Sequence, residues 1–394
     1  MMVKRKIIND PVYDGFLSID DPLILRVIEH PFFQRQRRIK QLGLTHLVYP
    51  GAMHTRFSHM LGALNLMGRA LEVLRQKGVE IEEEEARGAK LAILLHDIGH
   101  GPFSHTSEGV MVDMPHEEIT LRMMRRIDGE TGGALGTAIR IFSDCYPKRF
   151  LHQLVSSQLD MDRLDYLSRD SFFTGVSEGI VGTHRIISML NVHRDQLVVD
   201  EKGIYSIEKF IVSRRLMYWQ VYMHKTVIAA DQLLLNILRR ARELGVSPFC
   251  LGSSRRGDDG PSDGEGAAFD LDRFAGIDDD DIMVAVKRWQ YSPDPVLATL
   301  SRNLVERRLP AIVLSNRPFS AADLEGMPSF REDPGGYFHG TGVLRNRSYD
   351  FNDHEINILF KNGACLPIGE ASDQLDRHFL EKQVTKYFMF HPKG

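Results

Sequence analysis

The chain has few of the features that mark secreted or membrane-spanning proteins. It contains 3 Cys and 2 Trp in 394 residues. The isolated cysteines Cys145, Cys250 and Cys365 are too few for a disulfide framework. No apolar run approaches the length of a membrane span, and the first nine residues lack the apolar core of a signal peptide. We therefore expect a cytoplasmic protein with free thiols and no membrane contact.

A strong charge of either sign is also absent. The 49 Lys and Arg residues nearly balance the 53 Asp and Glu residues, which leaves a formal net charge of −4. Such a chain has no global attraction to nucleic acid, so binding to a polynucleotide would need a local basic patch. The 43% hydrophobic content is enough for a large core, and the length allows two domains or one domain with an appendage.

The hydrophobic pattern predicts a mainly α fold with a small C-terminal α+β lobe. Helical periods dominate residues 1–245, interrupted by one predicted β-hairpin near 197–207. Residues 246–267 are rich in glycine, serine and acid and predict a flexible loop. In the predicted lobe, 268–394, residues 310–314 and 356–360 read as strands. The acidic runs 82–85 and 278–281 precede apolar periods, so we interpret them as helix N-termini.

The most informative motif is the tract from His96 to His105. It places His96, Asp97, His100 and His105 directly after the apolar run 91–95. Imidazole and carboxylate together suit Mn, Fe, Zn or Ni better than ions that prefer oxygen alone. The intervening glycines and Pro102 end the helix and allow the imidazoles to turn toward one centre. The tract predicts a divalent-metal site and a hydrolase.

Further ligands are available on two predicted helices. His59 and Arg56 fall inside the wide apolar arc of a helix that begins near residue 56, where unpaired polar groups are costly to bury. An internal ion pair is the alternative to metal binding there. Asp162, Tyr166 and Asp170 form one stripe at helical spacing, and a solvated, salt-bridged face is the alternative interpretation. Arg214, Tyr218 and Tyr222 form a similar stripe, which would suit an anionic ligand that contains rings.

These motifs occur in an order that identifies a family resemblance. The chain resembles the HD-domain phosphohydrolases and, more narrowly, the deoxynucleoside triphosphate triphosphohydrolases (dNTPases, dGTPase type) of bacteria and of the human viral restriction factor that carries SAM and HD domains. No SAM domain is expected here. The matching segments are residues 33–35, 39–43, 49–52, 56–59, 96–105, 116–117, 162–166 and 222–225.

The resemblance implies roles for individual residues. The implied metal ligands are His59, His96, Asp97 and Asp162. The positions around the scissile phosphate are His100, His105, Glu108 and His116, with Glu108 where the family usually has Asp. The implied substrate-binding residues are Gln41, Arg56, Arg163, Tyr166, Asp170, Arg214 and Tyr222. Among these, the arginines match phosphate-binding positions and the others match the sugar pocket.

The implied reaction is attack of water at the α-phosphorus of a dNTP, which releases deoxynucleoside and triphosphate. It requires one divalent metal ion, with Mn, Fe, Zn, Ni and Mg as candidates, and allows a further Mg on the triphosphate. Metal-activated water, arginine forks for phosphate and histidine as proton donor suit this chemistry. Two alternatives stay open: another HD phosphohydrolase acting on nucleoside monophosphates or cyclic nucleotides, and a catalytically silent regulator that senses nucleotides or binds nucleic acid.

The resemblance also implies regulation by assembly. Relatives form oligomers with nucleotide effector sites between subunits, so we expect a homo-oligomer, dimer or tetramer, with a nucleotide effector. The residues at or near matching positions are Lys6, Asn9, Gln34, Arg37 and Arg185. A solvated basic helix face is the alternative interpretation of the segment 34–38.

Overall fold

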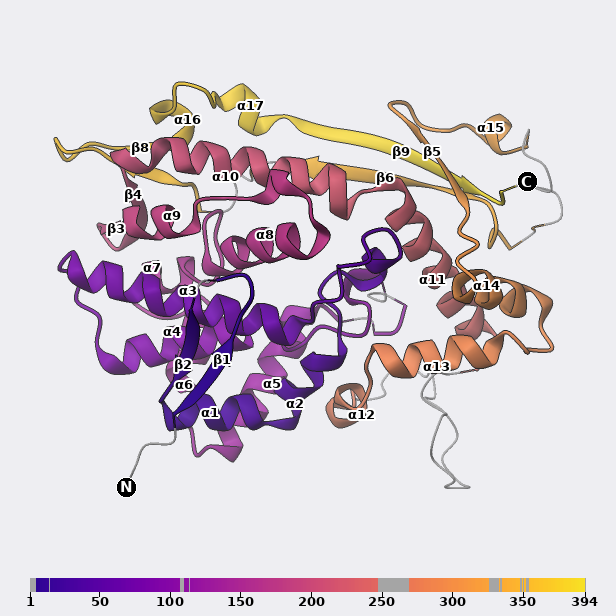
Figure 1. Ribbon diagram of the computed structural model, residues 1–394, viewed down its shortest axis with the longest axis horizontal. Coiled ribbons are helices and arrows are strands. Elements are labelled where there is room, and N and C mark those ends of the chain that lie inside the picture. The colour runs from indigo at the N-terminus through magenta and orange to yellow at the C-terminus, as the bar shows by residue number, and fades with distance from the viewer. Residues whose placement is uncertain are drawn as a thin grey trace.

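The computed structural model describes residues 5–13, 15–106, 110–112, 114–246, 269–325, 333, 335–347, 349, 351 and 354–393, with the backbone alone at residues 105, 321, 324 and 347. Most of these residues lie in helices, and the strands form three small sheets (Figure 1). The fold is therefore mainly α, with a helical core and a small C-terminal α+β region, as predicted. The predicted loop 246–267 falls outside the described residues except for Val246.

The long helix α3 packs against α2, α4, α8 and α9 within the N-terminal 245 residues. In chain order, the α-helices are α1 (Pro22–Glu29), α2 (Pro31–Arg35), α3 (Arg56–Gln76), α4 (Glu83–Leu95), α5 (His116–Glu130), α6 (Gly136–Phe142), α7 (Arg149–Gln153), α8 (Met161–Thr174), α9 (Thr183–Met189), α10 (Ile204–Met217) and α11 (Lys225–Glu243). Short 3-10 turns are η1 (Gln36–Arg38), η2 (Gly43–Leu47), η3 (Ser104–Thr106), η4 (Ser177–Gly179) and η5 (Glu201–Gly203).

Helix α4 ends directly before the predicted metal-binding tract that begins at His96. Its acidic first turn is closed by a capping box between Glu82 and Glu85, which confirms the predicted N-terminus. The apolar residues 91–95 are buried, and His96 follows as the C-cap residue. Helix α8 begins with the N-cap Asp160, whose side chain accepts from the backbone of Arg163, and ends at a left-handed Gly175. These ends place His96 and Asp162 at fixed points of the core.

The β-hairpin lies earlier in the chain than predicted. Strands β3 (Leu190–His193) and β4 (Gln196–Asp200) pair antiparallel, and the turn residues Arg194 and Asp195 both have positive φ. This is the backbone of a tight two-residue hairpin turn. The predicted hairpin near 197–207 is therefore wrong: residues 201–203 form a 3-10 turn and Ile204 begins α10. The period-2 pattern of 204–206 was too short to distinguish a strand from the first turn of a helix.

Helices α10 and α11 are separated by a π-helical segment. Tyr218–Tyr222 forms this segment, η6, and His224 then caps the N-terminus of α11 by accepting from the backbone of Thr226. A π-helical turn changes the angular spacing of side chains, and such turns are frequent at functional sites. It presents Tyr218 and Tyr222 edge to face, with ring centroids 5.2 Å apart.

The C-terminal region combines short helices with strands. Its helices are α12 (Leu271–Ala275), α13 (Asp279–Trp289), α14 (Pro295–Val305), α15 (Ala321–Glu325), α16 (Ile368–Ala371) and α17 (Arg377–Glu381). Its strands are β5 (Ala311–Ser315), β6 (Gly340–Arg347), β7 (Asn357–Leu359), β8 (Cys365–Pro367) and β9 (Gln383–His391). The predicted strands at 310–314 and 356–360 and the helix start at Asp278 are confirmed, the latter by a capping box with Asp281.

The sheets connect this region to the helical core. The long strand β9 lies between β5 and β6 in an antiparallel sheet that runs along the edge of the molecule, beside α10 in Figure 1. The N-terminal strands β1 (Lys6–Asn9) and β2 (Phe16–Ile19) form a separate pair. Strand β7 adds in parallel to β4, so the second sheet has the order β3-β4-β7-β8. A C-terminal strand thus completes a sheet that begins in the helical core.

The buried apolar core also includes residues from both the N-terminal helices and the C-terminal region. The largest buried cluster contains the apolar faces of α3, α4 and α8 together with Ile358, Ile368 and Leu380. A second cluster joins α11, α13 and α14 with Leu44 and Phe103. The division into units 1–245 and 268–394 stays a prediction. Among the helices that the structure describes, none combines the length and the apolar character needed to cross a bilayer.

Candidate metal centre

Four predicted ligands from three segments converge on one point. Nε2 of His59, on α3, lies 3.4 Å from Nε2 of His96 and 3.1 Å from Oδ1 of Asp162 on α8. Nε2 of His96 is 3.4 Å from Oδ1 of Asp162 and 3.4 Å from Oδ1 of Asp97. Donors that share one ion at about 2.1 Å are separated by roughly 3 to 3.5 Å. The spacing fits a single transition-metal ion.

The orientation of both imidazoles supports this fit. Nδ1 of His59 donates to Oδ2 of Asp165 over 2.8 Å, and Nδ1 of His96 donates to the carbonyl of Ile93 over 2.6 Å. In the neutral form, each ring therefore directs Nε2, with its lone pair, toward the shared point. Two lone pairs 3.4 Å apart repel each other unless a cation lies between them. Residues that hold the far nitrogen in this way are typical of metal-binding histidines.

Asp165 belongs to a buried ion network behind the centre. It is paired with Arg169 on the next turn of α8, and Arg169 in turn binds Asp10. The phenol of Tyr13 donates to the other oxygen of Asp165 over 2.8 Å. Helix α3 approaches this network at Gly62, where a Cβ would collide with the Asp165 carboxylate and the Arg169 guanidinium. The sequence pattern predicted no role for Asp165 or Arg169, although both stand at helical spacing from Asp162.

Neighbouring charges shift the pKa values of the ionisable groups in this centre. Burial alone would lower the pKa of His59, but hydrogen bonds to Asp162 and Asp165 raise it to about 10. Burial would raise the pKa of Asp97, yet the nearby charges of His96 and Arg56 hold it well below its usual value. The carboxylates therefore remain anionic and attract positive charge to the site.

A second cluster shares Asp97. Donor atoms of Asp97, His100 and His116 lie within 4.8 Å of one another, and the two imidazole rings stack with centroids 3.8 Å apart. Nε2 of His100 is 3.4 Å from Oδ1 of Asp97. The His100 carbonyl accepts from the buried Arg35 over 2.9 Å, which fixes the backbone here. The side chain of His105, and Glu108 as a whole, lie outside the part of the chain that the structure describes.

The three predicted phosphate-binding arginines have different surroundings. Arg56 is buried, pairs with Asp97 and donates to Ser104 Oγ. Arg163 pairs with its N-cap residue Asp160 at 3.1 Å. Arg214, on α10, lies 3.4 Å from Oε1 of Gln158, and its Nε is buried without a hydrogen-bond partner among the described residues.

Tyr166 connects these cations to the predicted sugar pocket. Burial raises the pKa of its phenol, while the positive charges of Arg214 and Arg163 act in the opposite direction. Both guanidinium groups are therefore near the phenol. The ring itself meets Tyr222 edge to face, with centroids 6.3 Å apart.

Asp170 forms the end of the predicted sugar pocket. One carboxylate oxygen lies 2.8 Å from Nε2 of His54, and the other accepts from the Tyr222 phenol over 2.7 Å. His54, which we did not predict, stacks on Phe173 with centroids 4.7 Å apart. Gln41 lies beside His54, since its backbone N donates to the His54 carbonyl, and its Oε1 is buried without a described partner. An unpaired acceptor in such a pocket suits a hydroxyl donor.

The predicted effector residues are not brought into one cluster by the contacts described. Arg37 donates to Gln34 over 2.9 Å and stacks over Phe57. Lys6 lies 3.8 Å from Glu29, and Asn9 ends strand β1. Arg185 donates to the carbonyl of Lys202 and lines a cavity of about 650 Å³ between α8 and α9.

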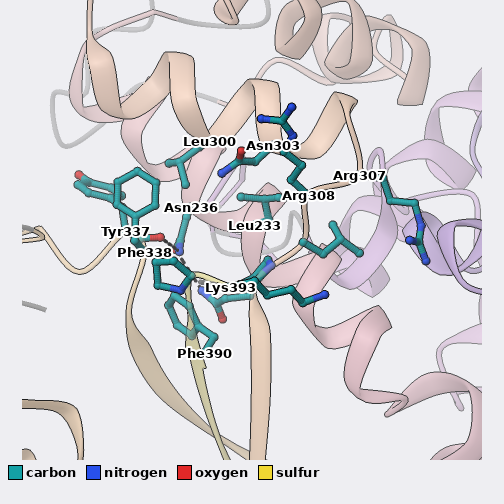
Figure 2. A pocket seen from close by; sticks show the side chains of 14 residues that line it. Leu233, Asn236, Leu300, Asn303, Arg307, Arg308, Tyr337, Phe338, Phe390 and Lys393 are labelled. Atoms are coloured by element: carbon teal, nitrogen blue, oxygen red, sulfur yellow. Dashed lines mark hydrogen bonds between the residues drawn. The ribbon is translucent and has the colours of Figure 1, made fainter. Parts of the chain in front are cut away.

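A second cavity, of about 360 Å³, lies away from the metal centre, between α11, α14 and the end of β9 (Figure 2). Asn236 donates to the carbonyl of Tyr337 across its wall. Arg307 points away from this pair in Figure 2 and donates to the carbonyl of Leu47 over 2.9 Å. The cationic groups at the rim therefore do not converge on a common point.

Comparison with known proteins places these features in context. The HD domain profile matches residues 56–170, and the profile of the HD associated region matches residues 181–248. The uncharacterized protein YwfO of Bacillus subtilis is 31% identical over 99% of this chain and 93% of its own length. A phosphohydrolase of Bacteroides thetaiotaomicron with a crystal structure is 44% identical, with a TM-score of 0.90 over 99% of this chain and 100% of that one.

A further similarity is confined to part of the chain. The deoxynucleoside triphosphate triphosphohydrolase SAMHD1 homolog of Dictyostelium discoideum is 32% identical over 60% of this chain. The chain spans about half of that relative, 49% of its length.

Proposed function

Since the chain belongs to the HD-domain phosphohydrolase family, we propose that it is a metal-dependent dNTP triphosphohydrolase. Water attacks the α-phosphorus of a dNTP, dGTP among them, and deoxynucleoside and triphosphate leave. The observation that carries the proposal is the convergence of His59, His96, Asp97 and Asp162 at the spacing of one bound ion, with Arg56 paired to Asp97 beside them. The partial match to a named dNTP triphosphohydrolase supports the choice of substrate.

A divalent ion held by His59, His96, Asp97 and Asp162 supplies Lewis acidity toward a phosphoryl oxygen and makes water more acidic. Two histidines and two carboxylates suit Mn, Fe, Ni or Zn, and Mg would accompany the triphosphate. The remaining chemistry belongs to side chains of the chain itself.

The arginines bind and orient the phosphates. A triphosphate carries about four negative charges, and guanidinium forks match phosphate oxygens in pairs. Arg214 has an Nε without a partner among the described residues, and Arg163 lies near the same phenol, so in this proposal both contribute donors to a bound phosphate chain. Arg56 sits between Asp97 and Ser104 and holds the α-phosphate end next to the centre.

The leaving 5′-oxygen needs a proton. His100 and His116 stack beside Asp97, which in this proposal places two imidazoles next to the reacting phosphorus. Each can hold a proton at Nε2 for the departing nucleoside. His105 and Glu108 complete this set in the proposal.

The sugar is bound between tyrosines. Asp170 holds the Tyr222 phenol in place, Tyr166 meets Tyr222 at its edge, and Gln41 offers a free carbonyl oxygen to the 3′-hydroxyl. A phenol packed against C2′ leaves no room for a 2′-hydroxyl. The proposal therefore includes discrimination against ribonucleotides.

The test is product analysis. Chelator-treated full-length protein is reloaded with Mn²⁺ and incubated with each dNTP and each rNTP, and the products are separated by chromatography. We expect deoxynucleoside and inorganic triphosphate from dNTPs, little product from rNTPs, and no product or retained metal with His96→Ala. Nucleoside monophosphate as the product would show that the protein is another kind of HD phosphohydrolase. Nucleotide binding without any product would indicate a catalytically silent regulator.

The proposal extends to assembly and regulation. We propose a cytoplasmic homo-oligomer with a nucleotide effector at Lys6, Asn9, Gln34, Arg37 and Arg185. The cavity beside Arg185 supports a ligand there. Light scattering with and without dNTP mixtures tests it, since an effector between subunits would increase the molar mass, and an unchanged mass and unchanged rate would contradict it.

A further inference from the structure

We propose that Asp144, His152 and His354 form a second divalent-metal site, of the zinc class, away from the HD centre. One donor atom from each residue lies within 4.8 Å of the others. Asp144 follows the end of α6, His152 lies in α7, and His354 precedes β7. The site does not depend on the function proposed above, because it shares no residue with the HD centre.

One backbone carbonyl positions two of the three ligands. The oxygen of Ile141 accepts from Nδ1 of His152 over 2.8 Å and from the backbone N–H of Asp144 over 3.3 Å. A carbonyl oxygen cannot donate, so Nδ1 of His152 carries the hydrogen in this contact. Nε2 of His152 is then left with its lone pair, the form in which imidazole binds a metal.

The third ligand comes from the C-terminal region. The ring of His354 meets that of His152 edge to face, with centroids 6.2 Å apart and an interplanar angle of 72°. His354 also lines a small cavity with Gln153 and Leu197, so the segment is packed against the helical core at this point. Two imidazoles from segments far apart in sequence are thus held next to one exposed carboxylate.

The separations allow an ion to be bound after a small rotation. Donors around tetrahedral zinc at about 2.1 Å lie roughly 3.4 Å apart. The separations are at most 4.8 Å, so reaching this spacing requires movement of at most about 1.4 Å, which the exposed side chain of Asp144 can make by rotating about χ1 and χ2. Two nitrogens and one carboxylate oxygen favour zinc over calcium or magnesium, and three protein ligands leave a fourth position for water.

A bound ion would link the segment before β7 to the connection between α6 and α7. Because the ligands converge only in the folded chain, metal binding favours the folded state and the docking of the C-terminal region.

The test uses the full-length protein and Zn²⁺ alone. Chelator-treated wild type, His354→Ala, Asp144→Asn and the exposed control His378→Ala are equilibrated with excess Zn²⁺ and desalted, and zinc per chain is measured by mass spectrometry. We expect His354→Ala and Asp144→Asn each to retain one zinc fewer than wild type and than His378→Ala. The rise in Tm on adding Zn²⁺ should be smaller in both.

His96→Ala should lose the zinc of the HD centre, whereas His354→Ala should lose the zinc of the second site. The two losses should therefore add in the double variant, which distinguishes the two centres. Should His354→Ala fail to fold by circular dichroism, Asp144→Asn gives the answer, since it replaces an exposed side chain with one of the same shape. Zinc content equal to wild type in a folded His354→Ala or Asp144→Asn overturns the proposal.

Discussion

Nδ1 of His59 donates to Oδ2 of Asp165 over 2.8 Å, and neither side chain has any exposed surface. Asp165 does not belong to the four converging donors, yet it sets the tautomer and the direction of the most buried one. The same carboxylate also neutralises Arg169. A single side chain thus links the metal centre to the ion network of α8.

We expect Asp165→Asn to weaken metal binding about 10- to 100-fold, because a neutral amide supports the donor strength of His59 less well than a carboxylate. Titration of the chelator-treated protein with Mn²⁺ measures the effect. Tyr13→Phe is the matched control: it removes the hydrogen bond from the Tyr13 phenol to Asp165 without touching His59. It should lower stability and leave metal affinity near wild type. Equal metal affinity in Asp165→Asn and wild type would refute the orienting role.

Gly62→Ala should destabilise the protein by about 1 to 3 kcal/mol, since the added methyl collides with Asp165 and Arg169 inside a packed network. Gly68→Ala lies on the same helix, where the nearest atom to the added Cβ is Lys90 Cε at 3.8 Å. It should instead stabilise by about 0.5 to 1 kcal/mol, the usual gain of Ala over Gly in a helix. Urea unfolding measures the change in the free energy of unfolding for both variants. The same sign for both would show that α3 does not approach α8 as described.

Arg214→Ala should raise the KM for dNTP roughly 10- to 100-fold with a smaller effect on kcat, because a charge-assisted contact to phosphate contributes about 1.5 to 3 kcal/mol. Lys209→Ala, an exposed cation on the same helix, removes the same charge without facing Tyr166. Initial rates over a range of dNTP concentrations separate the two parameters. An unchanged KM in Arg214→Ala removes the arginine from the phosphate site.

The stability of the α4 N-terminus should depend on pH through Glu85. Burial raises the pKa of this carboxyl, but hydrogen bonds from Lys148, the Glu82 backbone and Tyr146 outweigh it and lower the pKa below 4.5. A folded-state pKa below the unfolded one means that the stabilisation is complete above the unfolded pKa and is lost as pH falls through the folded value.

Glu85→Gln should therefore cost about 1 to 3 kcal/mol at pH 6 and progressively less as the pH is lowered below 4. Urea unfolding in chelator, which removes any effect of metal, measures the difference between variant and wild type at each pH. The exposed Glu370→Gln should show a small difference at every pH. A constant difference for Glu85→Gln would contradict the linkage.

Local patterns predicted the helices that carry His59, His96 and Asp162, because apolar spacing and acidic caps act within one element. The contacts of Asp165 and His54 could not be predicted in this way. They depend on the register of α8 against α3 and the preceding loop, which tertiary packing determines. The hairpin was misplaced for a related reason: the Arg194-Asp195 turn lacks the glycine that usually marks positive φ.

Strand β7 pairs with β4 in the second sheet, and the buried residues Ile358, Ile368 and Leu380 belong to the largest apolar cluster of the molecule. During synthesis, the ribosome has therefore to release residues up to Leu380 before the apolar interior can close. Until then, the edge of β4 and the surfaces beneath it are open to water and to other nascent chains. A stop codon placed after the HD region would leave that interior permanently uncovered, so we expect the shortened product to aggregate or be degraded rather than to persist as a smaller enzyme.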